Sequence, residues 1–109
     1  MSWDIDLVID TGGKELGIVS TIGNMTSNVN KMYCKAFDNE DGLDTLNDMQ
    51  CSEAIKRVSI AIIHMIKYKD ELMLMNPKNG WGNYDGALLY LCDLFEGCIK
   101  NPLCKIRIL

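Results

Sequence analysis

The sequence predicts an α+β fold, in which a small antiparallel sheet is covered on one face by about three helices. Two observations predict this class. Apolar and polar residues alternate at both ends of the chain, and apolar residues recur at helical spacing between them. With 109 residues, of which 48% are hydrophobic and 24% charged, we expect one compact domain over residues 1–109.

The expected sheet consists of an N-terminal hairpin and a C-terminal strand. In residues 3–10 apolar side chains alternate with Asp4, Asp6, Val8 and Asp10, which predicts a strand. A glycine pair then predicts a turn, and the β-branched residues of segment 16–22 predict the antiparallel partner. Residues 105–109 alternate basic and apolar side chains. We expect this last strand to pair with the first, because Lys105 and Arg107 would then lie beside aspartates.

Two helices are expected in the middle of the chain. The first follows the polar segment 24–28, where Thr26 or Ser27 can accept a hydrogen bond from its first amides, and it ends at the acidic segment 38–42. The second is expected over residues 52–68, and its apolar stripe is broad enough that we expect it to be the most buried helix. The stripe consists of Ile55, Val58, Ile62, Met65 and Ile66, widened by Ala54, Ala61 and Ile63.

A shaped loop is expected at segment 76–86, which is rich in glycine and asparagine and lies between two apolar helical patterns. The final helix is expected to begin at the cap Asn83, with Asp85 in its first turn, where a carboxylate is favoured by the helix dipole. A proline after Asn101 ends it.

Composition argues against several partners. The net charge is −4 and the 11 basic residues are scattered, so we expect no nucleic acid partner. The apolar runs are too short to span a bilayer, the acidic N-terminal segment is unlike a signal peptide, and we expect no membrane partner and a cytoplasmic location. The five cysteines are odd in number and lack zinc-site spacing, which favours free, mostly buried thiols and no bound metal or cofactor.

No catalytic set is complete in the sequence. His64 is the only histidine and is flanked by apolar helical residues, so a core or boundary imidazole is favoured over a general base. Asp4, Asp6 and Asp10 share one strand face, where a solvated surface is favoured over a cation or acid-base site. We favour a binding protein over an enzyme; the alternative is a small hydrolase that uses these aspartates or Asp85.

The candidate binding surface combines the two polar helix starts at segments 24–28 and 76–86. Aromatic faces and side-chain amides can together recognise a base or sugar edge. The structural alternative is that Trp81 closes the core while the asparagines cap turns, and Tyr33 is either at the surface or buried. The predicted ligand-binding or partner-binding residues are Asn24, Thr26, Asn28, Tyr33, Asn79, Trp81, Asn83, Tyr84 and Asp85.

Three motifs carry a resemblance that spans nearly the whole chain: WDIDLVIDTGG at residues 3–13, GNMTSNV at 23–29 and NPKNGWGNYDGA at 76–87. Together they resemble a family of small bacterial, phage and prophage proteins that has no assigned activity. The resemblance implies a compact accessory protein that acts in counter-defence in the host cytoplasm, by capturing a nucleotide-like small molecule or by binding a host immune protein. The alternatives are a homo-oligomeric interaction module, formed through the apolar central helix, or an immunity protein.

Overall fold

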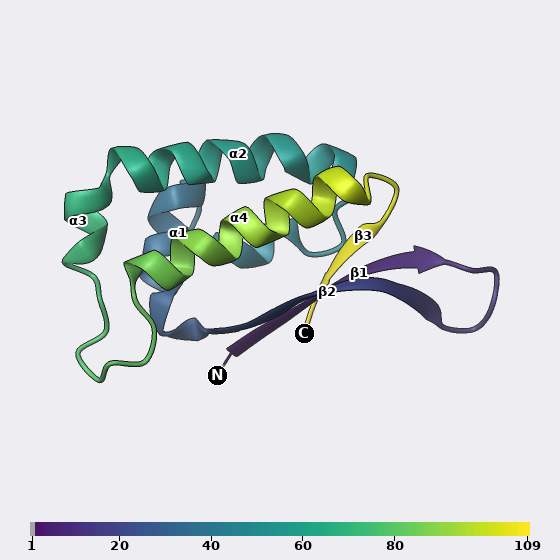
Figure 1. The fold of residues 1–109 in the computed structure, drawn as a ribbon, viewed down its shortest axis with the longest axis horizontal. Coiled ribbons are helices and arrows are strands. Elements are labelled where there is room, and N and C mark those ends of the chain that lie inside the picture. Colours follow the sequence, from purple (N-terminus) through teal and green to yellow (C-terminus); the bar gives the residue numbers. More distant parts are fainter. Residues whose placement is uncertain (1) are drawn as a thin grey trace.

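The alternating N-terminal segment forms strand β1 (Ser2–Asp10), the centre of a three-stranded antiparallel sheet with the order β2-β1-β3. The computed structural model describes residues 2–109. Strand β2 (Leu16–Thr26) completes the hairpin and strand β3 (Lys105–Ile108) pairs along the other side of β1. Helices cover one face of this sheet (Figure 1), which confirms the predicted α+β class.

Strand β2 is longer and less regular than its sequence predicts. It continues past the expected end at Ile22 to Thr26, because its polar residues lie on an edge strand that is open to solvent. Its register with β1 shifts twice, between Asp4 and Asp6 and between Leu7 and Val8. Both shifts leave one more residue on β2 than on β1, which is the geometry of a β-bulge.

The predicted charge pairing between the first and last strands is confirmed at one position. Arg107 lies opposite Asp6, and its Nη2 is 3.0 Å from Asp6 Oδ2. Thr21 on the other neighbouring strand donates its hydroxyl to Asp6 Oδ1 at 3.1 Å. Asp6 is only 7% exposed, so the expectation of a solvated aspartate face is wrong at this position. Lys105 lies opposite Val8.

Four α-helices and two short 3-10 helices are found among residues 2–109. In chain order they are η1 (Ser27–Val29), α1 (Asn30–Phe37), η2 (Gly42–Leu46), α2 (Cys51–Lys67), α3 (Lys69–Met73) and α4 (Tyr84–Lys100). Thr26 Oγ1 accepts from the Asn28 amide at the start of η1. Asn83 Oδ1 accepts from the Gly86 amide at 2.8 Å, which confirms Asn83 as the cap of α4.

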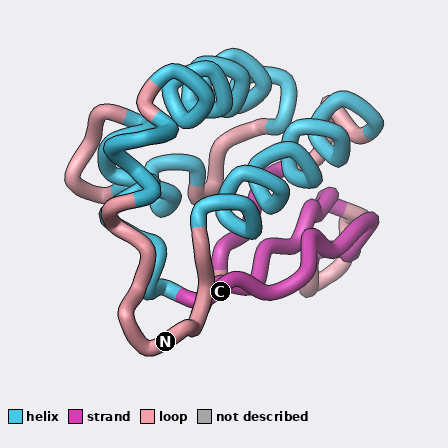
Figure 2. The backbone as a smooth tube through the Cα atoms, turned by 60° about the vertical axis from the view of Figure 1, so that its left-hand side comes forward, coloured by secondary structure: helices cyan, strands magenta, loops and turns pink. Residues whose placement is uncertain are grey.

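The helices form two tiers above the sheet (Figures 1 and 2). α1 and α4 lie next to the strands: the Trp3 and Tyr33 rings are 5.6 Å apart, and a Cβ on Gly97 would lie 2.9 Å from Ile22 Cδ1. α2 packs on α1 and α4 and lies farthest from the sheet. None of the helices within residues 2–109 combines the length and apolarity that crossing a membrane requires.

The central helix α2 is not the most buried one, contrary to expectation. Its buried face carries mostly small residues, Cys51, Ala54, Val58, Ala61 and Met65. Ile63 and Ile66, which the sequence placed in the apolar stripe, are 59% and 60% exposed. The tight packing of α2 against two helices favours small side chains, and the isoleucines lie on the outside.

The core also includes part of the connection between α1 and α2. Leu43 and Leu46 of η2 are fully buried beside α1. They join a cluster with contributions from every layer, which includes Ile5, Leu7, Met32, Tyr33, Leu91, Leu94 and Ile106.

Candidate functional site

The glycine-asparagine loop between α3 and α4 reaches down to the end of the sheet where β2 finishes (Figure 2). Gly82 determines how closely the loop approaches Thr26 and Val29. Its φ is +88°, a conformation that disfavours other residues, and a Cβ at this position would lie 2.6 Å from Thr26 Cγ2 and 3.0 Å from Val29 Cγ1. Asn28 Nδ2 donates to the Trp81 carbonyl at 3.4 Å. The loop is therefore in contact with both the end of β2 and η1.

These contacts form a surface hollow of about 490 Å³. Five of the nine predicted site residues line it, together with one residue that sequence reasoning missed: Asn24, Thr26, Asn28, Asn79 and Trp81, with Ser2. The two polar helix starts thus share one surface, as their composition suggested. Ser2 carries no sequence signal of its own, because it enters the hollow through its pairing with Thr26 across the β1–β2 ladder.

Trp81 does not close the core. Its side chain is 70% exposed, so the structural alternative that it acts as a plug is wrong. Asn79 Oδ1 accepts from the Trp81 amide at 2.9 Å, which shapes the loop. The loop is held by its backbone and by the close approach at Gly82. The indole therefore remains available as a flat apolar face beside the hollow.

Side-chain hydrogen bonds hold the residues of β1 and β2 that line the hollow. Asn24 Nδ2 lies within hydrogen-bond distance of Ser2 Oγ at 3.0 Å and of Asp4 Oδ1 at 3.1 Å. Thr26 Oγ1 accepts from the Asn28 amide at 3.3 Å. With a third contact, to the Trp3 carbonyl at 3.3 Å, Asn24 Nδ2 has both of its donors engaged, and its oxygen can still accept. Asn28 and Asn79 keep donor and acceptor capacity beyond their bonds to Trp81.

Of the residues within 2–109 that line the hollow, none is Lys, Arg, Asp or Glu. Amides, hydroxyls and one indole can recognise a polar ring by stacking and by hydrogen bonds to its edge. Tight phosphate binding instead relies on charge-assisted bonds, mainly from Arg and Lys. The hollow therefore suits a neutral ring better than a phosphate group.

Two predicted site residues belong to the core. Tyr33 is fully buried and donates its hydroxyl to the Ala87 carbonyl at 2.9 Å. Tyr84 is 3% exposed and donates to the Met65 carbonyl at 2.7 Å. Burial raises the pKa of both phenols, since a phenolate would lose its hydration there. Of the two positions left open for Tyr33, the structure has the buried one. Neither tyrosine lines the hollow, because each ring fills the core and its hydroxyl bonds to a neighbouring helix.

The two remaining predicted residues are at the start of α4 and do not line the hollow. Asn83 is occupied as the helix cap. Asp85 is exposed in the first turn, where its carboxylate is favourable for the helix but contacts none of the loop amides described above.

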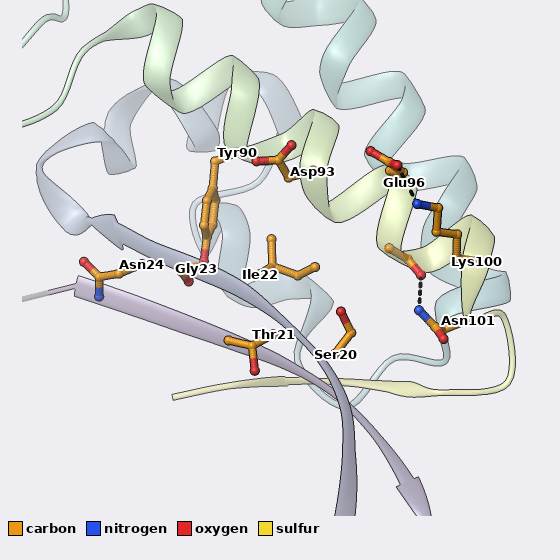
Figure 3. A pocket seen from close by; sticks show the side chains of 11 residues that line it. Ser20, Thr21, Ile22, Gly23, Asn24, Tyr90, Asp93, Glu96, Lys100 and Asn101 are labelled. Atoms are coloured by element: carbon orange, nitrogen blue, oxygen red, sulfur yellow. Dashed lines mark hydrogen bonds and ion pairs between the residues drawn. The ribbon is translucent and has the colours of Figure 1, made fainter.

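A second hollow, of about 400 Å³, lies between β2 and α4 (Figure 3). Tyr90 spans it and donates to the Gly23 carbonyl at 3.0 Å. Glu96 and Lys100 form an ion pair of 2.7 Å on its rim, and their hydrogen bond lowers the pKa of Glu96 and raises that of Lys100. The sequence signal for this rim is an ordinary charged helix face, and Glu96 and Lys100 already pair with each other.

The remaining residues that could carry out catalysis or bind a metal make structural contacts or are buried. His64 Nδ1 lies 2.8 Å from the Ala36 carbonyl and links α2 to α1. Cys51, Cys98 and Cys104 are buried free thiols, and burial raises the pKa of Cys51 and Cys98, which disfavours the reactive thiolate. Within residues 2–109 no three His, Cys, Asp or Glu side chains are arranged to hold a metal ion.

Comparison of the chain with protein families, curated proteins and solved structures gave no match. Fold and site together define a small α+β protein with a neutral, tryptophan-edged surface hollow. We therefore infer function from the geometry of that hollow.

Proposed function

We propose that this protein is a non-enzymatic binding protein that captures a nucleotide-like small molecule in the hollow beside Trp81. The observation that carries the proposal is a 70% exposed indole at the edge of a hollow lined by neutral amides and hydroxyls. A base stacked on an aromatic side chain gains about 1–3 kcal/mol. Asn28 and Asn79 supply donors and acceptors for the edges of the base and ribose, and Asn24 supplies an acceptor oxygen.

The charge of the hollow narrows the class of ligand. Because the lining residues within the described part of the chain carry no cationic side chain, recognition rests on the base and the sugar, and a phosphate group contributes little. A nucleoside should therefore bind about as tightly as its monophosphate. The resemblance to phage proteins extends the proposal to counter-defence, in which the captured molecule is a signal of host immunity in the host cytoplasm.

Isothermal titration with adenosine, guanosine and their monophosphates tests the site. Trp81→Ala should weaken binding about 5-fold to 150-fold, which is the stacking energy expressed as an affinity ratio. Leu74→Ala is the matched control, since Leu74 is 88% exposed and lies outside the hollow; it should leave affinity unchanged.

Two outcomes would contradict the proposal. One is the absence of binding by every nucleoside and nucleotide tested. The other is binding that Trp81→Ala leaves intact, which would place the ligand elsewhere. If the monophosphates bind and the nucleosides do not, the narrower inference that a neutral ring is recognised is refuted.

A further inference from the structure

A small hollow lies where α2 meets the end of α1 and η2. Its volume is about 200 Å³, and its lining residues within the described part of the chain are Ala36, Phe37, Thr45, Arg57 and Ile60. Ala36 is fully buried, Phe37 is half-buried and Ile60 is 41% exposed, so most of the wall is apolar. Pockets for whole small molecules usually measure about 300–1,000 Å³. A hollow of this size instead suits one apolar side chain of a partner.

Arg57 supplies an unpaired cation at the edge of this hollow. Within residues 2–109 its guanidinium forms no hydrogen bond and no ion pair, although Glu53 lies one helical turn before it. The only other polar side chain among the described lining residues is Thr45, which donates its hydroxyl to the Gly42 carbonyl at 2.9 Å. A free guanidinium can bind a carboxylate through two parallel hydrogen bonds.

The exposed face of α2 around the hollow has a net positive charge. Lys56, Arg57 and Lys67 are exposed and positively charged, whereas Glu53 is the one acid on this face within the described chain. Ile63 lies one turn beyond the hollow and is 59% exposed. An apolar centre with cations around it is complementary to an apolar anchor that has acidic neighbours.

We propose that this hollow binds an acidic segment of another protein. One large apolar side chain of the segment enters between Phe37 and Ile60, and a neighbouring carboxylate pairs with Arg57. The concave shape favours such a segment over an anionic lipid surface, which would require apolar side chains that protrude together. The net charge of −4 opposes approach to an anionic membrane, whereas a short acidic segment contacts only the positive face of α2.

This site is separate from the one proposed to capture a nucleotide-like molecule. The two hollows share none of their lining residues within 2–109. Binding of the acidic segment should therefore be unchanged in Trp81→Ala, and failure of either proposal leaves the other intact.

Fluorescence anisotropy on the full chain tests the site with labelled peptides of about 12 residues. The acidic probe has a central leucine with a glutamate on each side, and alanine and glutamine elsewhere. The control probe has lysines in place of the glutamates. The acidic probe should bind, and more weakly as salt is added, because exposed charge pairs are screened. The lysine probe should bind at least about fivefold more weakly.

Substitutions on the protein locate the binding. Arg57→Gln should weaken the acidic probe about fivefold, whereas Lys14→Gln, which removes the same charge from the exposed hairpin turn, should leave binding unchanged. Ile60→Gln should weaken it about tenfold, because part of the apolar contact is lost. Ile99→Gln is the matched control, since Ile99 is 52% exposed on α4 and lies outside the hollow. Circular dichroism confirms that each variant is folded.

A double-mutant cycle identifies the ion pair with Arg57. Replacing the glutamates of the probe by glutamine should weaken binding to the wild type about fivefold. The same replacement should have little effect on binding to Arg57→Gln, because the energy of the pair can be lost only once.

Three results would overturn the proposal. Absence of binding by the acidic probe up to about 1 mM excludes this partner chemistry. Equal binding of the acidic and lysine probes, or acidic-probe binding that is unchanged in both Arg57→Gln and Ile60→Gln, excludes recognition at this hollow. Co-sedimentation with vesicles of phosphatidylcholine and phosphatidylserine, without binding of the acidic probe, would assign this face to a lipid surface instead.

Discussion

Replacing Gly82 by alanine should dislodge the loop that forms one side of the hollow. The substitution introduces two separate penalties. An alanine at φ +88° is strained by about 1–2 kcal/mol, and its Cβ would lie 2.6 Å from Thr26 Cγ2 and 3.0 Å from Val29 Cγ1. Overpacking of this kind costs about a further 1–3 kcal/mol. We expect Gly82→Ala to lower the free energy of unfolding by about 2–5 kcal/mol.

Gly80→Ala provides the matched control in the same loop. Gly80 has a similar φ of +77°, but a Cβ there meets nothing within 4 Å. It should therefore lose only the backbone strain of about 1–2 kcal/mol. The difference between the two variants isolates the steric contact of the loop with the end of β2, and both free energies can be measured by urea unfolding followed by far-UV circular dichroism.

A second substitution tests whether the contact between the new Cβ and Thr26 causes the loss of stability. Thr26→Ser removes the methyl group nearest to the new Cβ, so it should recover part of the stability lost in Gly82→Ala. In the Gly80→Ala background it should recover nothing. Equal losses in Gly82→Ala and Gly80→Ala, with no rescue by Thr26→Ser, would refute the docked position of the loop.

Three further predictions concern the strands, the core and the last helix. Asp6→Asn should destabilise the fold by about 1–3 kcal/mol in chemical denaturation, because it weakens a buried ion pair; a larger loss is not expected, since the Arg107 side chain is 32% exposed. An unaltered midpoint would contradict the pairing. Burial raises the pKa of Tyr33 and Tyr90 above the unfolded value of about 10, so the unfolded chain ionises first and stability should fall as pH rises above about 10. Urea midpoints that stay constant between about pH 9 and about pH 11 would argue against this. Asn83→Ala should cost about 1 kcal/mol in thermal unfolding, whereas Asn83→Asp should be nearly neutral because aspartate also caps.

The elements that follow from local signals were predictable. Alternation identified β1, and the aspartate and basic patterns of the two end strands led to the pairing of Asp6 with Arg107. The asparagine before an apolar helical pattern identified the cap of α4. Each of these signals depends on neighbouring residues or on simple charge complementarity, both of which can be read from sequence.

The surroundings of individual aromatic rings were not predictable. Tyr33 and Tyr84 are polar-tipped residues close to polar segments, but their hydroxyls find carbonyls at Ala87 and Met65, distant in sequence. Trp81 stays outside because the loop is anchored through its backbone and Gly82. Such choices depend on which helices approach each other, and no local pattern encodes that approach.

The prediction of which face of α2 is buried was wrong for a related reason. Hydrophobicity alone placed the large isoleucines inside, whereas the space between α1 and α4 accommodates small residues such as Ala54 and Ala61. Side-chain volume at a contact determines how closely helices approach, and it outweighs hydrophobicity here.

The two register shifts of β2 interrupt the open edge of the sheet. β2 is an edge strand, and Leu16, Ile18 and Val19 make its outer half apolar and exposed. An edge of this kind offers unpaired N–H and C=O groups to any strand of another chain. Because each extra residue breaks the alternation of those groups, an incoming strand can follow the edge for only a few residues before it falls out of phase.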